Sequence, residues 1–536
     1  MPQQPRFVYI SSRASRDPVK TVIVFPPSDR AKNVDDAATF AKESGWMDEV
    51  EQDAAVLMVA VAGEGWDSCP ADMPMRLYQE NRRSFLAHSQ GVQGRGGSLW
   101  AWETLVYLVG YGDGASFAGS YQLSCPGFAA ASVLVDGAPA CLDALEEPSA
   151  HWLVADPDDY ALKNRDIPIA VWFMGRSDHG AMFDHARRVD GAVETREAIS
   201  AGALTRIFEN PINSGMQVRE TSGLMGVAPE IASEGMEFFS HVIRWKNGPD
   251  GTLAPRRTKA EFYSDGRYLH HEVTCGGGSY HYAVYLPEGC SRADARDLPL
   301  VLSLHGRGEP TWIFAAKNGW EELADETGEF AVLLPDSPGN VWSYDRDAQA
   351  LELVVGQAIA EYGFDPTRVY ITGFSNGAVF TCQMATSAPG YFAAASPWNG
   401  PSVDAIRSSG LGDFIFAPEF EGAGVEMPFW IAAGDSDDKA GTLSSAEVDI
   451  ILAANGCERT CGTHLDSGKT YGEKAGYSEG GRFSTDLFFN GEKSPRVALT
   501  LMKDMPHGAI ADEARASWEF MKQFRRPKGS GRVEVI

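Results

Sequence analysis

The sequence predicts an α/β protein of two tandem domains, each built on a doubly wound, mostly parallel sheet. Three observations predict this architecture. The chain has 536 residues, which is too long for one ordinary hydrophobic core. Short apolar runs alternate with segments of helical spacing, as expected where helices cover both faces of a parallel sheet. The order of these runs also occurs twice along the chain, which indicates a repeated fold.

The second half of the chain has the clearer strand signals. Residues 261–289 are expected to form two strands joined by a glycine-rich turn. Residues 346–363 have helical spacing and are expected to form a covering helix. Six apolar runs are expected to form parallel strands: LPLVLSLHG (298–306), FAVLLPD (330–336), RVYITGF (368–374), FAAASPWNG (392–400), MPFWIAAGD (427–435) and RVALTLMKD (496–504). These signals predict an eight-stranded sheet.

The first half repeats the segments of the second half in the same order. The matched pairs are KTVIVFPPSD with LPLVLSLHGRGE, LVYLVGYGDGASF with RVYITGFSNGAVF, CPGFAAASVLVDGAP with APGYFAAASPWNGPS, IPIAVWFMGRSD with MPFWIAAGDSD, and EGMEFFSHVIRW with SWEFMKQFRR. Two unrelated α/β domains would share strands of this kind but not this order, so we predict a tandem duplication.

The duplication sets the expected domain boundaries. Residues 1–245 are predicted to form the first domain and residues 262–526 the second. Between them, residues 246–261 are rich in Gly, Pro and charge and are expected to be a linker. Residues 527–536 are expected to be a flexible tail.

Composition excludes several classes of partner. The formal net charge of -27 argues against nucleic acid and anionic membranes, which need a basic face. No segment reaches the roughly 18 apolar residues of a membrane span, and the N-terminus has no apolar stretch suited to a signal peptide. The 8 cysteines are scattered, with Cys457 and Cys461 as the one close pair, so free thiols and a cytoplasmic location are expected.

A candidate nucleophile, Ser375, lies in the sequence GFSNG. A single GxSxG match is weak, but this one follows an apolar strand and precedes a helix-like segment. That context is typical of a nucleophile elbow, a sharp turn that exposes a serine hydroxyl. Gly373 and Gly377 flank the serine because such a turn leaves no room for side chains. The alternative is a glycine-rich turn with an incidental serine.

A serine hydroxyl needs a base, and the base needs an acid that orients it. His507 lies in the loop between the last strand and the last helix, in the chain order Ser, acid, His. Three carboxylates follow the preceding strand: Asp435, Asp437 and Asp438. The spacing from Gly434 favours Asp437, and the other two are expected to be solvated or to cap a helix.

Attack on a carbonyl also needs hydrogen-bond donors for the developing oxyanion. The backbone N–H of Asn376, directly after the candidate nucleophile, is one expected donor. The second is expected from the loop HGRGE, as the backbone N–H of Arg307. Gly306 and Gly308 allow that backbone to approach a substrate closely. A purely structural turn is the alternative.

Taken together, PLVLSLHGRGE, DPTRVYITGFSNGA and MPHG resemble the α/β-hydrolase family of polyhydroxybutyrate depolymerase-like and feruloyl-esterase-like enzymes. The resemblance covers roughly residues 262–525. It implies an α/β-hydrolase fold, a catalytic triad of Ser375, Asp437 and His507, and hydrolysis of carboxylic esters without a cofactor. The chain departs from the family at Arg307, where a smaller residue is usual. Family members are also commonly secreted.

Four side chains on neighbouring loops are candidates for substrate contact. They are His305, Trp312, Trp342 and Trp398. Aromatic walls suit an apolar or ring-bearing acyl group, although a single tryptophan in such a loop is more often part of the core than a substrate contact. Arg307 could pair with a substrate carboxylate or point to solvent.

The first copy lacks the residues that carry chemistry in the second. Gly112 stands in the place of Ser375, and Met225 stands in the place of His507. Pro26 and Pro27 stand against His305 and Gly306, and proline has no N–H to donate. The acid is retained as Asp178, but it has no imidazole to orient. Asp113 lies one position past the turn and cannot replace the nucleophile. The first domain is therefore predicted to be a degenerate, pseudo-enzyme copy, which either shapes the active-site mouth or only stabilises its partner.

The leading function is a serine esterase that acts on a small-molecule or oligomeric ester through an acyl-enzyme on Ser375. A serine peptidase or amidase is the second, because the same triad cleaves amides. The third is a non-catalytic binding or scaffold protein. No metal, nucleotide or flavin motif is visible, so no metal and no cofactor are expected. The oligomeric state stays open, because the duplication can supply internally what a dimer would.

Overall fold

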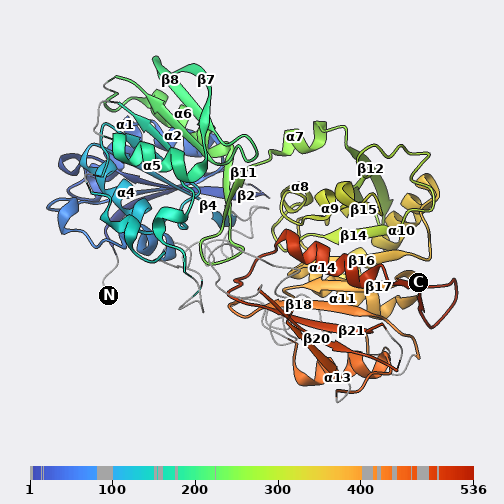
Figure 1. Ribbon diagram of the computed structural model, residues 1–536. Helices are drawn as coiled ribbons and strands as arrows, with labels where there is room; N and C mark the ends of the chain where they lie inside the picture. Colours follow the sequence, from blue (N-terminus) through green and yellow to red (C-terminus); the bar gives the residue numbers. More distant parts are fainter. Residues whose placement is uncertain are drawn as a thin grey trace. The chain divides into compact units, whose positions relative to one another are not determined.

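The computed structural model divides the chain into two compact units (Figure 1). The described residues up to Arg256 form the first unit, and those from Arg257 onward form the second. The structure describes residues 4–13, 15, 17–80, 100–139, 141–149, 154, 161–175, 179–223, 225–400, 414–418, 420, 424–437, 443–459, 462–466, 482–491 and 494–536.

The first unit contains a nine-stranded sheet in the order β1-β3-β2-β4-β5-β6-β9-β8-β7. The six strands from β3 to β9 in this order are parallel, and antiparallel strands flank them on both sides. The strands are β1 (Arg6–Ile10), β2 (Pro18–Phe25), β3 (Val56–Ala60), β4 (Trp100–Tyr111), β5 (Ala131–Val135), β6 (Ala170–Met174), β7 (Val193–Ser200), β8 (Ala203–Glu209) and β9 (Gln217–Thr221).

Helices cover both faces of this sheet. Its helices are α1 (Val34–Glu43), α2 (Trp46–Gln52), α4 (Asp113–Ser124), α5 (Gly180–Asp190) and α6 (Pro229–Ser240). Helices α4 and α5 contribute to one hydrophobic cluster, through Ala118 and Phe183 among others. On the other face, Phe239 of α6 stacks on Tyr107 of β4 and on Trp46 of α2. The apolar runs predicted as strands are buried because both faces are covered.

The second unit contains a ten-stranded sheet in the order β12-β13-β15-β14-β16-β17-β18-β21-β20-β19. The six strands from β15 to β21 in this order are parallel. The strands are β12 (Tyr268–Cys275), β13 (Gly278–Tyr285), β14 (Leu300–Leu304), β15 (Ala331–Pro335), β16 (Val369–Phe374), β17 (Ala394–Trp398), β18 (Phe429–Gly434), β19 (Gly462–Asp466), β20 (Phe483–Phe488) and β21 (Val497–Met502). The predicted eight strands are all present. The prediction of eight was too low, because β19 and β20 lack an unbroken apolar run.

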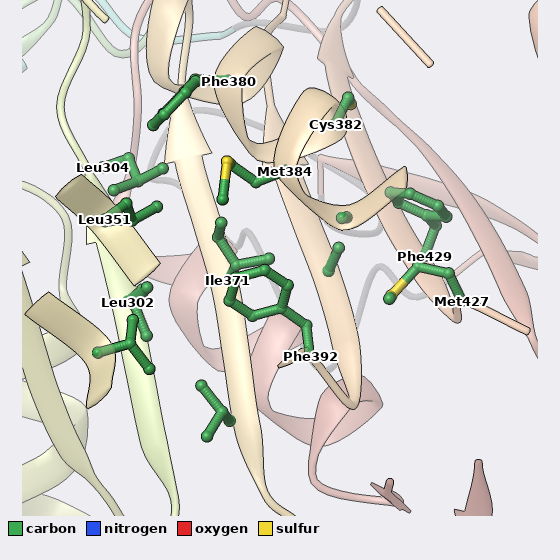
Figure 2. Packing of buried hydrophobic residues seen from close by; sticks show 14 of the residues in the cluster. Leu302, Leu304, Leu351, Ile371, Phe380, Cys382, Met384, Phe392, Met427 and Phe429 are labelled. Carbon is green, nitrogen blue, oxygen red and sulfur yellow. The ribbon is translucent and has the colours of Figure 1, made fainter. Parts of the chain in front are cut away.

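The helices of the second unit also lie on both faces of its sheet. They are α7 (Lys259–Ser264), α8 (Thr311–Phe314), α9 (Trp320–Thr327), α10 (Tyr344–Tyr362), α11 (Asn376–Ser387), α13 (Ser445–Ala454) and α14 (Ala511–Met521). Figure 2 shows the core under α11, where Met384 lies over Ile371 of β16. The neighbouring Tyr370 points to the opposite face and packs edge-on against Trp518 of α14. This alternation follows from the two-residue period of a strand.

The two units share their topology. Each has six parallel strands in the same crossover order, followed by an antiparallel hairpin at one edge and preceded by an antiparallel strand at the other. The second unit adds only β12 at this latter edge. The same order of elements on two sheets supports the predicted tandem duplication.

The segments expected to be a linker and a tail contain regular structure. In the first, β11 (Thr252–Pro255) pairs with β10 (Val242–Trp245), and Thr258 caps α7. In the second, β23 (Glu534–Val535) pairs with β22 (Phe524–Arg525). The segment expected to be a linker thus contains β11 and the start of α7, whereas the segment expected to be a flexible tail pairs with β22 through β23. No helix of the described residues is long and apolar enough to span a membrane.

Candidate active site

Three loops of the second unit converge at one edge of its sheet. Ser375 follows β16, Asp437 follows β18 and His507 follows β21. These strands are parallel, so their carboxyl ends lie on the same side. Ligand and catalytic sites of open α/β sheets lie at this edge. The fold therefore brings together three residues that are far apart in the sequence.

The turn that carries Ser375 has a backbone conformation that few residues adopt. Its φ is 55° and its ψ is -114°, and its N–H donates to the carbonyl of Trp398 at 3.0 Å. A Cβ at Gly373 would lie 2.5 Å from the carbonyl oxygen of Gly377, and one at Gly377 would lie 2.4 Å from that of Leu304. The flanking glycines are thus required by backbone crowding, as the sequence predicts for a nucleophile elbow.

The three side chains form one hydrogen-bonded array. His507 Nδ1 lies 2.7 Å from a carboxylate oxygen of Asp437, and His507 Nε2 lies 2.9 Å from Ser375 Oγ. A carboxylate only accepts hydrogen bonds, so Nδ1 carries the proton and Nε2 presents a lone pair to the serine hydroxyl. The Asp437 side chain is 1% exposed and that of His507 is 15% exposed. The acid is buried and the base is reachable.

The structure separates the three candidate acids. Asp435 is exposed, and its carboxylate accepts a hydrogen bond from the hydroxyl of Ser436. Asp437 is the carboxylate that contacts His507. Asp438 lies outside the described residues. The spacing from Gly434 therefore selected the carboxylate that lies against the imidazole.

Two backbone N–H groups near the serine have no partner among the described residues. They belong to Arg307 and Asn376, the donors that the sequence predicts for an oxyanion hole. The N–H of Gly308, directly after Arg307, donates to the carbonyl of Asn340 at 2.7 Å and so fixes the loop that carries Arg307. A Cβ at Gly306 would lie 2.9 Å from the ring of Phe374, so this position also requires glycine. The side chain of Arg307 is exposed.

The side chain of Asn376 holds the turn from the outside. Its Oδ1 accepts from the N–H of Trp342 at 2.7 Å, and its Nδ2 donates to the carbonyl of Trp342 at 3.1 Å. Asn376 is only 2% exposed. These paired bonds fix the direction of the Asn376 N–H, because they clamp the first residue of α11 to the loop before α10.

His305 is a support for the loop rather than a substrate contact. It is fully buried, its Nδ1–H donates to Gly306 O at 2.8 Å and its Nε2 accepts from the N–H of Ser337 at 3.0 Å. Burial lowers the pKa of His305, so the ring is neutral. Its own carbonyl accepts from Trp342 Nε1 at 3.1 Å. The expectation that His305 contacts a substrate is wrong, because both ring nitrogens are used inside the protein.

All three candidate tryptophans are buried, and two of them have their contacts filled by the core. Trp342 is 2% exposed and stacks on Phe380. Trp398 is fully buried, and its indole N–H donates to the hydroxyls of Ser396 and Ser517 at 2.9 Å. Neither presents a surface to a ligand, so the expected aromatic wall is corrected at these positions. Trp312 is also buried, at 5% exposure, and its indole N–H has no partner among the described residues.

Phe374 and Lys317 are neighbours of the array that the sequence interpretation missed. The Phe374 ring lies 5.0 Å from that of His507, and Lys317 Nζ lies 4.6 Å from the centre of the Phe374 ring. Lys317 also pairs with the buried Glu309 at 2.7 Å. Phe374 directly precedes Ser375, so its position was a usable signal, whereas nothing near Lys317 in the sequence marked it.

The first unit has the same turn without a side chain. Gly112 has φ 57° and ψ -124°, close to the values of Ser375. A Cβ at Gly112 would lie 3.9 Å from Pro27, which is an ordinary contact. The first unit therefore keeps the backbone of the elbow and lacks only its hydroxyl at this position.

The surroundings of this turn are filled by other contacts. The carboxylate of Asp113 accepts from the N–H of Ser28 at 2.9 Å and also from its hydroxyl. Ser28 follows the two prolines, in the place that Arg307 has in the second unit. Met225 directs its N–H to Asp136 at 3.3 Å and offers no base. Asp178, the retained acid, lies outside the described residues.

The strand order and the serine at a sharp strand-to-helix turn define the second unit as an α/β-hydrolase domain. Residues 280–409 match the family model described as Esterase PHB depolymerase. The matched region contains the loop with Arg307 and the turn with Ser375. Asp437 and His507 lie beyond it.

Curated relatives match parts of the chain. A bifunctional acetylxylan esterase/xylanase XynS20E of Neocallimastix patriciarum is 34% identical over 124 residues, which is 22% of this chain and 18% of that protein. Poly(3-hydroxyalkanoate) depolymerase C of Paucimonas lemoignei is 33% identical and is matched over 19% of this chain and 28% of its own length. Acetylxylan esterase A of Aspergillus ficuum is 31% identical, over 27% of this chain and 52% of its own. The chain thus spans about a fifth to a half of these relatives. Among solved structures, an acetyl xylan esterase from Aspergillus awamori has 17% identity and a TM-score of 0.38, covering 47% of this chain and 99% of its own.

Proposed function

We propose that this protein is a serine hydrolase of carboxylic esters and that the array of Ser375, His507 and Asp437 is its catalytic triad. The observation that carries the proposal is the pair of contacts at His507, 2.9 Å to Ser375 Oγ and 2.7 Å to Asp437. Both are hydrogen-bond distances: the first allows proton transfer from Ser375 to His507, and the second orients the imidazole. The strained turn that presents the serine is a second, independent support.

The geometry gives each residue a step in the reaction. Ser375 Oγ attacks the ester carbonyl carbon while His507 Nε2 takes the hydroxyl proton. The carbonyl oxygen becomes an oxyanion, which accepts from the N–H groups of Arg307 and Asn376. Collapse breaks the bond to the alcohol, which leaves with the proton from His507. Water then attacks the acyl-enzyme by the same route, and Asp437 stabilises the imidazolium in both halves.

Ester substrates are favoured over amides by the relatives, whose names describe acetylxylan esterases, a feruloyl esterase and a poly(3-hydroxyalkanoate) depolymerase. All of these names describe hydrolysis of carboxylic esters. The buried positions of Trp342 and Trp398 remove the argument for a ring-bearing acyl group that the sequence suggested. A short acyl group is therefore the first substrate class to test, with p-nitrophenyl acetate as the probe.

Active-site labelling tests the proposal directly. A fluorophosphonate phosphonylates an activated serine with loss of fluoride, and mass spectrometry of the digested protein identifies the residue. We expect one adduct, on Ser375, and none in the His507→Ala variant, since the base is then missing. Hydrolysis of p-nitrophenyl acetate should follow the labelling, and a peptide p-nitroanilide should be cleaved far more slowly. Folded protein that takes up no label at Ser375 would sink the proposal.

A further inference from the structure

Asn399 occupies the point where the loops of the array come together. It directly follows β17, has φ 47° and is fully buried. Its N–H donates to the carbonyl of Ala432 in β18 at 2.8 Å. Positive φ is uncommon for a residue with a side chain, although Asn adopts it more readily than most. The backbone therefore fixes this side chain between two neighbouring strand ends.

The side-chain amide of Asn399 connects the acid loop with the histidine loop. Its Oδ1 accepts from the N–H of Gly434 at 2.7 Å, and its Nδ2 donates to the carbonyl of Gly508 at 2.9 Å. Gly434 ends β18 just before the turn to Asp437, and Gly508 directly follows His507. One buried amide thus ties together the two loops whose separation sets the contact between the acid and the base.

Glu513 lies beside the second N–H of the same amide nitrogen. It is fully buried on α14, and its Oε2 accepts from the N–H of Ile510 at 2.9 Å at the start of that helix. Its Oε1 lies 3.4 Å from Asn399 Nδ2. The amide nitrogen therefore faces two acceptors, with the shorter bond to Gly508 and the longer one to Glu513.

The surroundings of Glu513 keep it protonated at neutral pH. Burial is the largest influence and raises the pKa of Glu513 from 4.5 to about 8. Arg482, before β20, and Lys317, before α9, favour its ionised form, whereas Asp512 on the same helix opposes it. A neutral carboxyl is a weaker acceptor than a carboxylate. The neutral carboxyl therefore attracts this second N–H only weakly, in line with the longer distance to Glu513.

We propose that Asn399 and Glu513 are positioning residues that together form a protonation-sensitive latch on the loop of His507. With Glu513 neutral, the Asn399 amide holds Gly508 and keeps the imidazole against Asp437. When Glu513 ionises, it accepts more strongly from the second N–H of Nδ2, which shifts the amide toward α14 and lengthens the bond to Gly508 O beside the catalytic base. This inference rests on the proposed function, because it assigns these residues to the same site.

The first unit offers a built-in comparison at this position. Asp136 follows β5 as Asn399 follows β17, and its φ is 50°. Its carboxylate accepts from the N–H groups of Met225 at 3.3 Å and Gly226 at 2.6 Å, in the loop that corresponds to that of His507. The side chain holds the same loop in both units, but the amide that donates to the loop and faces a carboxyl is specific to the unit with the array.

The pH dependence of activity tests the latch. We expect the kcat for p-nitrophenyl acetate, and the rate of fluorophosphonate labelling, to fall in the unaltered protein as the pH rises through about 8. The Glu513→Gln variant keeps an acceptor for the Ile510 N–H but does not titrate, so its activity should not fall there. Glu519→Gln, which removes a partly exposed carboxylate on the same helix, is the matched control and should behave like the unaltered protein.

A second variant tests the amide itself. Asn399→Asp keeps the acceptor for Gly434 but cannot donate to Gly508, so kcat should fall by about 10²-fold with KM changed by less than about 2-fold. An alkaline decline that persists in Glu513→Gln, or an Asn399→Asp effect confined to KM and thermal stability, would overturn the latch. No label on Ser375 in the unaltered protein at any pH would instead defeat the proposed function, and the latch with it.

Discussion

The two units of this protein have one scaffold and differ in what their central turn carries. Gly110 and Gly114 of the first unit meet the same backbone crowding as Gly373 and Gly377 of the second. The turn between them has the same backbone conformation in both, with Gly112 in one and Ser375 in the other. The sheet and its sharp turn are therefore stable without any chemistry. What the scaffold does depends on a few side chains at the strand ends.

The strain at the turn is informative because only one unit has a reason to carry it. A residue with a Cβ in the left-handed region costs about 1–2 kcal/mol, whereas glycine adopts it freely. Ser375 bears this cost and its hydroxyl contacts His507, whereas Gly112 avoids it and has no such partner. Strain is kept where the side chain has a function.

The residue after the turn shows a second difference. In the second unit, the Asn376 side chain is bonded to the backbone of Trp342, which leaves two N–H groups free for a ligand. In the first unit, Asp113 turns its carboxylate onto the N–H of Ser28. The first unit has thus not only lost its nucleophile. It has also used internally one of the donors that an oxyanion would need.

The largest expected effect comes from removing the hydroxyl that distinguishes the two turns. Ser375→Ala should lower kcat by about 10⁶-fold, because Ser375 is the hydroxyl that contacts His507 Nε2 among the described residues. The measurement is hydrolysis of p-nitrophenyl acetate together with fluorophosphonate labelling of the full chain. Label or turnover that remained in this variant would break the comparison, since it would have to come from elsewhere in the protein.

The next effect concerns the acid. Asp437→Asn keeps the shape of the side chain but no longer requires the proton of His507 on Nδ1, so kcat should fall by about 10⁴-fold with KM little changed. Asp435→Asn is the matched control, because Asp435 is exposed and follows the same strand. Equal losses in the two variants would contradict the assignment of the acid.

A transplant from the first unit gives a smaller effect. Asn376→Asp introduces the residue type of Asp113, which cannot donate to Trp342 O and can accept from the N–H of Arg307. Loss of one oxyanion donor should lower kcat by about 10²–10³-fold. Asn376→Ala removes the clamp without supplying an acceptor, so its loss should be nearer tenfold. A variant Asn376→Asp with full activity would show that the side chain at this position does not control the donors.

The sequence was most informative where a single local pattern determines structure. Ser375 with its flanking glycines, the succession of strands along the chain and the histidine loop all follow from short motifs read in chain order. Their convergence was predictable because parallel strands end on one side of a sheet. The features that the sequence did not predict also have a physical explanation. Trp342 and Trp398 lie on loops and strand ends, where the motif does not say which side faces the core. The strands β19 and β20 contain polar residues that interrupt any apolar run, and Asn399 is identified only by its contacts. The cytoplasmic location and the role of the first unit stay predictions.

Restoring the missing hydroxyl of the first unit gives the smallest effect and isolates what the scaffold alone can do. Gly112→Ser should be tolerated, because its Cβ meets only Pro27 at 3.9 Å and Ser375 adopts the same turn. We expect a loss of about 1 kcal/mol in stability and no gain of activity, since Met225 cannot act as a base and Asp113 occupies the donor of Ser28. The variant is made in the Ser375→Ala background, so that any fluorophosphonate adduct reports on the first unit alone. An adduct at position 112 would mean that the turn activates a serine without a histidine beside it, and the difference between the units would then reduce to one side chain.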